Sequence, residues 1–266
     1  MSYLEAVCIA IIEGLTEFLP VSSTAHMIFT STFFGIQDDG FVKMFQVSIQ
    51  FGAILAVVVL YKSYFFSSLS VYIPLAIGVI PALLLGALFD DAIDQVLEKP
   101  VPIAIALIIG GIVFIFLHRI FPVKPEQPTV PVTRLKAFKI GLWQCLALMP
   151  GTSRAAACLI GGMQQGLSRQ QAAEFSFFLA VPTLLAVTFY SLFIKSWHQD
   201  GALIKGFHLI TESHYNLIIF MLGNLIAFGI ALIAVKYFIR LLTRYGLQIW
   251  GWYRISVGLI MLFLLH

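Results

Sequence analysis

The sequence predicts an all-α integral membrane protein with about six transmembrane helices and two re-entrant helical hairpins. The first observation is composition: 60% of the 266 residues are hydrophobic and 11% are charged, whereas a soluble domain carries about 25% charged residues. The second is that several apolar runs approach the roughly 20 residues that cross a bilayer. The third is that two other apolar stretches are each interrupted at the middle by a proline and hydroxyl residues.

Six uninterrupted apolar stretches are the expected spans. They cover approximately residues 44–61, 71–89, 101–118, 172–194, 215–236 and 248–265. The two interrupted stretches cover about 3–35 and 136–166. A broken helix is tolerated at membrane depth where protein or a water-filled cavity satisfies the freed backbone groups. We therefore expect each interrupted stretch to enter and leave the membrane on one side.

Loop charges predict the orientation, because Lys and Arg accumulate in cytoplasmic loops. Basic residues dominate 119–139 and 236–247, whereas acidic residues dominate 90–99. The two basic segments are expected in the cytoplasm and the acidic one outside. Both termini are then outside, the first hairpin enters from outside, and the second enters from the cytoplasm. The proline-rich segment 122–131 is expected to be an extended cytoplasmic connector.

The two halves of the chain resemble each other. A shift of 130 residues places Pro20 on Pro150, and the hydroxyl residues Ser22 and Ser23 on Thr152 and Ser153. The sequence predicts a single membrane domain over 1–266, with repeat halves at approximately 1–118 and 136–266 and a connector at 119–135. Because the halves have opposite predicted orientations, they form an inverted-topology repeat, which places its site near the midplane.

Other classes of site have little support. The net charge is +3, which gives no indication of a nucleic-acid partner. The cysteines Cys8, Cys145 and Cys158 lie in apolar surroundings without the spacing of a metal or redox site, and they are expected to be small buried hydrophobic residues.

The first polar motif lies in the first interrupted stretch. Glu13 and Glu17 are four residues apart and share a helical face, and His26 follows nearby. An ionisable residue at membrane depth costs about 2.5–3.5 kcal/mol, so these groups need partners or a polar cavity. Pro20 ends the helix. Three hydroxyl residues after it can cap the next helix or contact phosphate: Ser22, Ser23 and Thr24.

The second polar motif runs from Pro150 through Gly151, Thr152 and Ser153 to Arg154. It opens a helix, whose free N–H groups and dipole favour an anion. The Arg154 guanidinium suits phosphate oxygens. Two such helix starts facing each other would hold a pyrophosphate. Two structural interpretations stay open: the hydroxyls simply cap helices, or a glutamate of the first motif pairs with Arg154 as a buried ion pair.

Four stretches make the sequence similar to the undecaprenyl pyrophosphate phosphatase (bacitracin-resistance) family. They are Glu13 to His26, Lys43 to Val59, Trp143 to Arg154 and Gly161 to Pro182. The resemblance implies a multi-pass enzyme of the bacterial inner (plasma) membrane with its site open to the periplasm or outside. It would hydrolyse undecaprenyl pyrophosphate to undecaprenyl phosphate and inorganic phosphate, with a divalent cation, Mg²⁺ or Ca²⁺. This activity recycles the lipid carrier of peptidoglycan synthesis.

The resemblance also implies which residues act. Ser23 would attack phosphorus with His26 as its base, or His26 itself would be the nucleophile. Arg154 would stabilise the transition state, and Glu13 and Glu17 would hold the cation or orient His26. The prenyl tail would stay in membrane lipid. Further phosphate contacts are expected from Ser22, Thr24, Gly151, Thr152 and Ser153.

Some positions depart from the family's usual pattern, and a second function remains open. Hydroxyl residues are usual in the family where Ala155 and Cys158 stand, and glycine is usual at Ala25. Two hydroxyls that could contact phosphate are thus missing, and activity is expected to persist at a reduced level.

The alternative function is a transporter or flippase of a lipid phosphate or other anion, because inverted repeats with broken helices also describe transporters. A transporter needs the anion site but no nucleophile and base.

Overall fold

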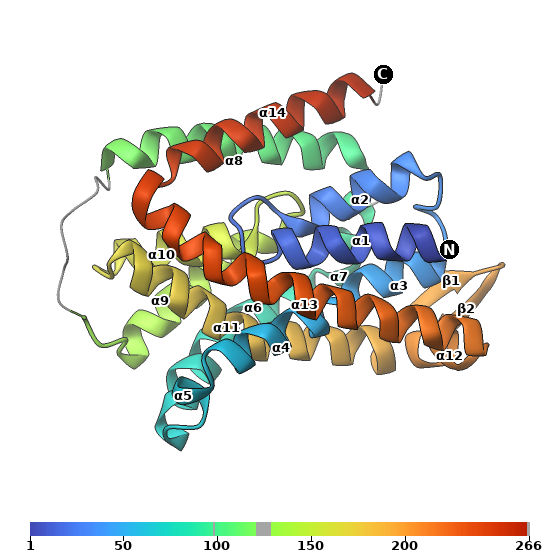
Figure 1. The fold of residues 1–266 in the computed structure, drawn as a ribbon, viewed down its shortest axis with the longest axis horizontal. Helices are drawn as coiled ribbons and strands as arrows, with labels where there is room; N and C mark the ends of the chain where they lie inside the picture. Colours follow the sequence, from blue (N-terminus) through green and yellow to red (C-terminus); the bar gives the residue numbers. More distant parts are fainter. Residues whose placement is uncertain (98, 121–128, 265–266) are drawn as a thin grey trace.

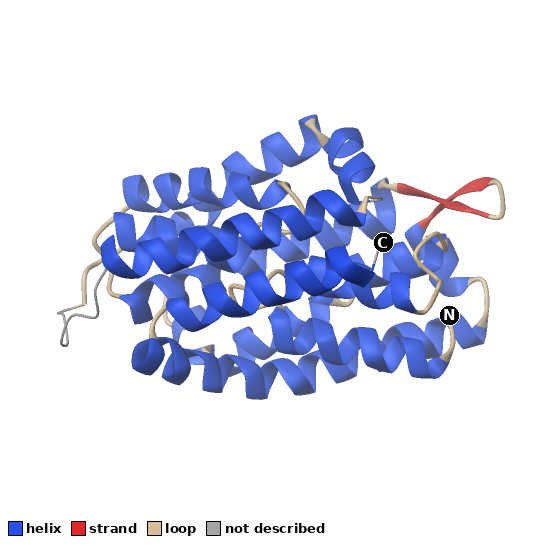
Figure 2. Cartoon of the chain, turned by 90° about the horizontal axis from the view of Figure 1, so that it is seen from above, coloured by secondary structure: helices blue, strands red, loops and turns tan. Residues whose placement is uncertain are grey.

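A computed structural model describes residues 1–97, 99–120 and 129–264. The chain is a bundle of α-helices that run broadly along one direction, with a short β-hairpin at one end (Figures 1 and 2). The N-terminus and the end of the last helix lie toward that same end (Figure 1). The proline-rich part of the predicted connector, 121–128, falls outside the described residues.

Both interrupted stretches are pairs of helices broken at the predicted prolines. In the first, α1 (Tyr3–Thr16) is followed by α2 (Ser23–Phe33), and the break contains Pro20. In the second, α9 (Arg134–Gln144) continues as the 3₁₀ helix η2 (Cys145–Leu148) and is followed by α10 (Arg154–Gln164). The first pair extends from the end that bears the β-hairpin and the second from the opposite end (Figure 1). Their breaks therefore lie in the interior of the bundle.

Five helices of the described residues are long and apolar enough to cross a membrane, and these match five of the six predicted spans. They are Gly40–Leu60, which contains α3 (Gly40–Ser48) and α4 (Gln50–Leu60); Leu69–Leu88, which contains η1 (Leu69–Val71) and α6 (Tyr72–Leu88); α8 (Pro100–Ile120); Arg169–Ile194, which contains α11 (Arg169–Phe189) and the π-helix η3 (Tyr190–Ile194); and α13 (His214–Tyr245). The sixth prediction corresponds to α14 (Gln248–Leu264), an apolar helix of 17 residues.

The smaller elements are α5 (Lys62–Phe65), α7 (Asp90–Leu97), α12 (Gly206–Thr211) and the antiparallel strands β1 (Ser196–Gln199) and β2 (Ala202–Lys205). The predicted all-α fold class is confirmed, and this short β-hairpin is an element that the prediction did not include. Its two turn residues, Asp200 and Gly201, have φ of 50° and 80°. An Asp-Gly pair with positive φ is the usual two-residue hairpin turn, so the pair was the local signal for this element.

The two halves pack in matching pairs. Helix α1 lies on α13, and α9 lies on α6; α8 and α14 pack on each other, as do α4 and α11. The α8–α14 contact is reciprocal at its closest point. A Cβ on Gly111 would lie 2.6 Å from the carbonyl oxygen of Gly251, and one on Gly251 would lie 2.7 Å from the carbonyl oxygen of Gly111. These glycines therefore allow the two helices to approach at backbone distance. The predicted division into halves and a connector stays a prediction.

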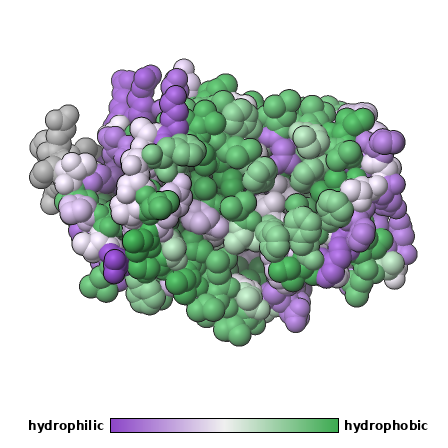
Figure 3. Space-filling model, turned by 90° about the horizontal axis from the view of Figure 1, so that it is seen from below, coloured by the Kyte–Doolittle hydropathy of each residue, from purple (hydrophilic) through white to green (hydrophobic). Residues whose placement is uncertain are grey.

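The outer surface is apolar over the middle of the molecule and polar toward the two ends (Figure 3). Large side chains on several spans are exposed, including Leu84 at 61%, Ile109 at 56% and Leu225 at 67%. A soluble protein rarely exposes so large an apolar area. The exposed belt therefore belongs in lipid, and the chain is a multi-pass membrane protein.

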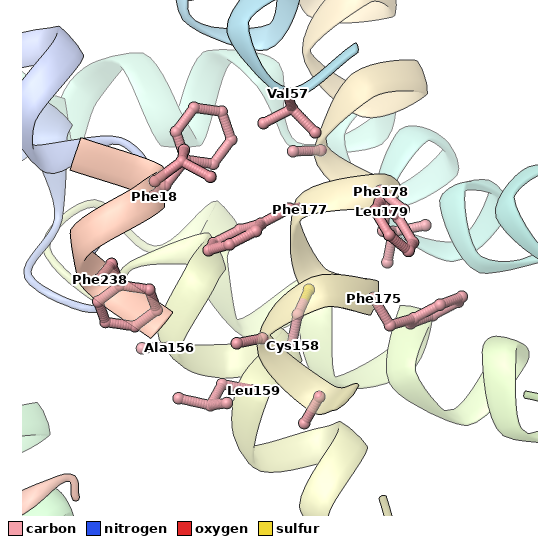
Figure 4. Close-up of a cluster of buried hydrophobic side chains, with 14 of the residues drawn as sticks. Phe18, Val57, Ala156, Cys158, Leu159, Phe175, Phe177, Phe178, Leu179 and Phe238 are labelled. Carbon is pink, nitrogen blue, oxygen red and sulfur yellow. The ribbon is translucent and has the colours of Figure 1, made fainter. Parts of the chain in front are cut away.

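The largest core cluster lies beside the broken helices. Phe18, in the first break, contacts Phe177 of α11 edge to face, with ring centroids 5.3 Å apart. Phe238 of α13 and Cys158 of α10 belong to the same cluster (Figure 4). This packing fixes the first break against both α10 and α11.

The replacement Phe177→Ala should lower the free energy of unfolding by about 3–5 kcal/mol, because it opens a cavity in a fully buried aromatic cluster. Thermal and denaturant unfolding in detergent measure this loss. The control is Phe263→Ala, which removes a ring that is 81% exposed to lipid. Equal losses in the two variants would contradict the assigned core.

Candidate active site

Two helix starts with the same unusual backbone define the site. Ser22 caps α2 with φ of 71°, and Ser153 caps α10 with φ of 75°. Their hydroxyl oxygens accept hydrogen bonds from the N–H groups of Ala25 and Ala156. Non-glycine residues rarely adopt positive φ, and such strain concentrates at functional sites. Both serines are buried.

These caps correct the register of the predicted repeat at this point. Ser22 corresponds to Ser153, a shift of 131 residues (153 − 22), and not to Thr152. The first helical residues then correspond as Ser23 and Arg154. The two halves therefore place a hydroxyl and a guanidinium at equivalent positions.

Glu17 joins the two helix starts. The Ser23 hydroxyl donates to Glu17 Oε2 at 2.5 Å, and Arg154 Nη2 donates to Glu17 Oε1 at 2.6 Å. Arg154 Nη1 also donates to the carbonyl oxygen of Ser176 at 2.8 Å. The Glu17 and Arg154 side chains are 6% and 10% exposed. In this setting a charge-assisted pair is strong, and it holds the serine hydroxyl against a carboxylate.

Glu13 lies one helical turn before Glu17 and is fully buried. Within the described residues, neither of its carboxylate oxygens has a hydrogen-bond partner. A buried carboxylate without a donor is costly, and it needs a proton or a cation. Two adjacent carboxylates thus offer oxygen ligands of the kind that Mg²⁺ and Ca²⁺ prefer.

A cation would need further ligands besides these carboxylates. No group of three or more His, Cys, Asp or Glu side chains among the described residues could hold a metal ion. Mg²⁺ commonly binds through one or two carboxylates, waters and the phosphates of a substrate. The residues present fit such a substrate-completed site.

Both ring nitrogens of His26 have partners other than the Ser23 hydroxyl. Its Nδ1 lies 2.8 Å from the carbonyl oxygen of Ser22, and its Nε2 lies 2.9 Å from the hydroxyl of Tyr253. The carbonyl can only accept, so Nδ1 carries the proton and Nε2 accepts from the tyrosine when the ring is neutral. The imidazole also stacks on Tyr253, with centroids 5.7 Å apart and an interplanar angle of 7°. Glu17, and not the expected His26, contacts the Ser23 hydroxyl.

A cavity of about 1130 Å³ opens beside the two helix starts. Most of the predicted site residues line it: Glu17, Ser22, Ser23, Thr24, Gly151, Ser153 and Arg154. Glu13, His26 and Thr152 lie outside its lining as the structure describes it. Apolar residues of α6 and α11, including Leu83 and Leu185, form much of the remaining wall. The cavity reaches β1 and therefore extends toward the end of the molecule that bears the β-hairpin.

Sequence reasoning missed Arg254, which holds the two breaks together. This residue of α14 is 1% exposed. Its guanidinium donates to the carbonyl oxygens of Pro20 at 3.0 Å, Gly151 at 2.8 Å and Thr152 at 3.1 Å. Broken helices leave carbonyl groups without intrahelical partners, and these three receive theirs from one side chain. The available signal was an arginine inside an apolar span, which is costly and usually functional.

Of the two positions where the family usually has a hydroxyl residue, one has a structural explanation. Cys158 is fully buried, and its Sγ donates to Gln144 Oε1 at 3.6 Å, while its surroundings are the aromatic cluster of α11 (Figure 4). Ala155 is also buried, and nothing in the structure explains its identity.

Comparisons with known proteins cover nearly the whole chain. The profile of the family described as Bacitracin resistance protein BacA matches residues 6–260. An undecaprenyl-diphosphatase of Flavobacterium psychrophilum is 47% identical over 266 residues, covering 100% of this chain and 97% of that protein. An undecaprenyl-diphosphatase of Porphyromonas gingivalis is 44% identical, covering 97% and 95%. One of Bdellovibrio bacteriovorus is 40% identical, covering 100% and 97%.

Replacing Arg254 with Met should leave three buried carbonyl oxygens without donors, at about 1–3 kcal/mol each. We expect a large fall in melting temperature in detergent. Arg254→Lys should recover only part of it, because one ammonium cannot reproduce the guanidinium fork. The control is Arg240→Met at an exposed position of α13. An unchanged melting temperature for Arg254→Met would show that the carbonyls do not depend on this side chain.

Proposed function

The chain belongs to the bacitracin resistance protein BacA family, and from this premise we propose where and how it acts as an undecaprenyl-diphosphatase. It is an enzyme that hydrolyses undecaprenyl diphosphate to undecaprenyl phosphate and inorganic phosphate. The observation that carries the proposal is the Ser23–Glu17–Arg154 chain of hydrogen bonds on the wall of the cavity. It combines a nucleophile, a base and a phosphate ligand at one place.

In this proposal the diphosphate binds between the two helix starts. The N–H groups at the starts of α2 and α10, with the helix dipoles, favour the anion. Arg154 contributes its guanidinium to the terminal phosphate and to the charge that develops in the transition state. The apolar wall from α6 and α11 accommodates the beginning of the prenyl chain.

Ser23 is the proposed nucleophile and Glu17 its base. The hydroxyl proton passes to Glu17 Oε2 as Ser23 Oγ bonds to the terminal phosphorus. The bond from that phosphorus to the bridging oxygen breaks, and undecaprenyl phosphate leaves. Water then hydrolyses the phosphoserine to inorganic phosphate and restores the hydroxyl. His26, held by Ser22 and Tyr253, orders the start of α2 in this scheme.

A divalent cation, Mg²⁺ or Ca²⁺, is part of the proposal. Glu13 and Glu17 would hold it, since the Glu13 carboxylate is buried and its two oxygens have no partner among the described residues. Bound there, it would neutralise charge on the phosphate oxygens. The remaining ligands would come from substrate and water.

We propose that the cavity opens to the periplasm or outside. Its mouth includes acidic residues of α7, with Asp90 and Asp94 paired to Lys195. The opposite end holds the end of α8 and the start of α9 (Figure 1), which carry Arg119, Arg134 and Lys136. Basic residues accumulate on the cytoplasmic side, so the mouth faces away from the cytoplasm. A transporter is not favoured, because transport would not need a serine held by a carboxylate.

Trapping the intermediate distinguishes the two possible nucleophiles. Turnover of a prenyl diphosphate is stopped by denaturation at mildly alkaline pH, and mass spectrometry locates the phosphate. We expect it on Ser23; phosphate on His26 would overturn the assignment.

The turnover number should fall by about 10²–10³-fold or more in Ser23→Ala and in Arg154→Ala. Thr243→Ala, at an exposed hydroxyl of α13, is the control.

Removal of divalent cations should stop phosphate release, and Mg²⁺ or Ca²⁺ should restore it. Glu13→Gln should raise the cation concentration for half-maximal activity by about 10–100-fold, as loss of an oriented group at a metal site does. The titration of activity against Mg²⁺ measures this shift. Full activity in excess chelator would refute the cation, and an unshifted titration would exclude Glu13 as its ligand.

A further inference from the structure

We propose that Gln144 is a phosphate-binding residue of the cavity, an inference that rests on the proposed function. Gln144 is the last residue of α9, is 2% exposed and lines the cavity. It contacts Cys158, which lies one helical turn beyond Arg154 on α10. Gln144 and Arg154, the proposed phosphate ligand, therefore line the same cavity from neighbouring helices.

The hydrogen bonds of Gln144 leave its donor free. Its Oε1 accepts from the Thr183 hydroxyl at 3.3 Å and from Cys158 Sγ at 3.6 Å. Its Nε2 is buried and has no hydrogen-bond partner in the part of the chain that the structure describes. Buried polar groups nearly always have partners, and an unpaired one is costly. A bound group that accepts hydrogen bonds would complete this site.

The repeat places Gln144 at the position that Glu13, the proposed cation ligand, occupies in the other half. Aligned on the caps Ser22 and Ser153, Gln144 corresponds to Glu13, because each lies nine residues before its cap. Both side chains are buried beside a break, and both have unpaired polar atoms. One half presents acceptors, which suit a cation, and the other presents a donor, which suits phosphate oxygens.

A purely structural role accounts for the amide oxygen of Gln144 but not for its amide nitrogen. The Oε1 contacts with Thr183 and Cys158 brace α9 against α11 and α10. Bracing does not use the N–H groups. The phosphate oxygens proposed to bind at Arg154 are acceptors, so they can accept hydrogen bonds from Nε2 of Gln144, which the bracing contacts do not use.

The test uses inorganic phosphate as the probe on the full-length protein in detergent. Phosphate should inhibit prenyl diphosphate hydrolysis and raise the melting temperature, and both effects report its affinity. In Gln144→Glu and Gln144→Met, we expect the inhibition constant for phosphate and the KM for substrate to rise about 10-fold or more. The control Gln164→Glu adds the same charge at an exposed position, where an acceptor for Trp143 Nε1 is retained, and should leave both constants unchanged.

Three results would overturn the proposal. The first is wild-type phosphate affinity in Gln144→Met. The second is full activity in Gln144→Glu, which would mean that the amide oxygen, not the nitrogen, faces the cavity. The third is an equal loss of phosphate affinity in Thr183→Val, which removes the brace and keeps the amide. Absence of hydrolysis by the wild type would refute the proposed function instead, and the phosphate-induced rise in melting temperature would still test Gln144.

Discussion

The structure depends most on the contact between Arg254 and the carbonyl groups of the two breaks. A helix can stop inside a bilayer only if the backbone groups it frees find partners. Here Pro20, Gly151 and Thr152 all present carbonyls to one guanidinium. Because Arg254 belongs to α14, the last helix of the chain, the site cannot assemble until the C-terminal span is in place. The cost of burying the arginine is offset by bonds that no lipid or apolar residue could supply.

The same contact positions the two helix starts at which we propose that the diphosphate binds. Ser23 and Arg154, the first residues of α2 and α10, line the cavity, and the first N–H groups of a helix have no intrahelical partner. The positive φ of the caps Ser22 and Ser153 turns the chain sharply into these helices. Glu17 then links Ser23 and Arg154 across the halves. The backbone arrangement at the two breaks thus positions the side chains proposed to react.

Sequence reasoning located the breaks well because Pro20 and Pro150 have strong local effects on a helix. It also brought Glu17 and Arg154 together, although as one alternative among several. It did not give the partner of Ser23: the family resemblance implied His26, but the imidazole contacts Tyr253, which is 227 residues later in the chain. The Arg254 contacts and the one-residue change of register at the caps likewise depend on tertiary packing. Local pattern predicts where a helix stops, not which distant group satisfies it.

The two halves share a backbone but divide the chemistry between them. At the first helical residue one half has Ser23 and the other Arg154, and nine residues before the cap one has Glu13 and the other Gln144. Two copies of the acidic half would repel a diphosphate, whereas two copies of the other would bind it without a nucleophile or base. The repeat supplies a pair of helix starts joined by Glu17, and in the proposed mechanism the differences between its halves orient the substrate. In the proposed mechanism the terminal phosphate meets both Ser23 and Arg154, because Glu17 holds these two side chains together.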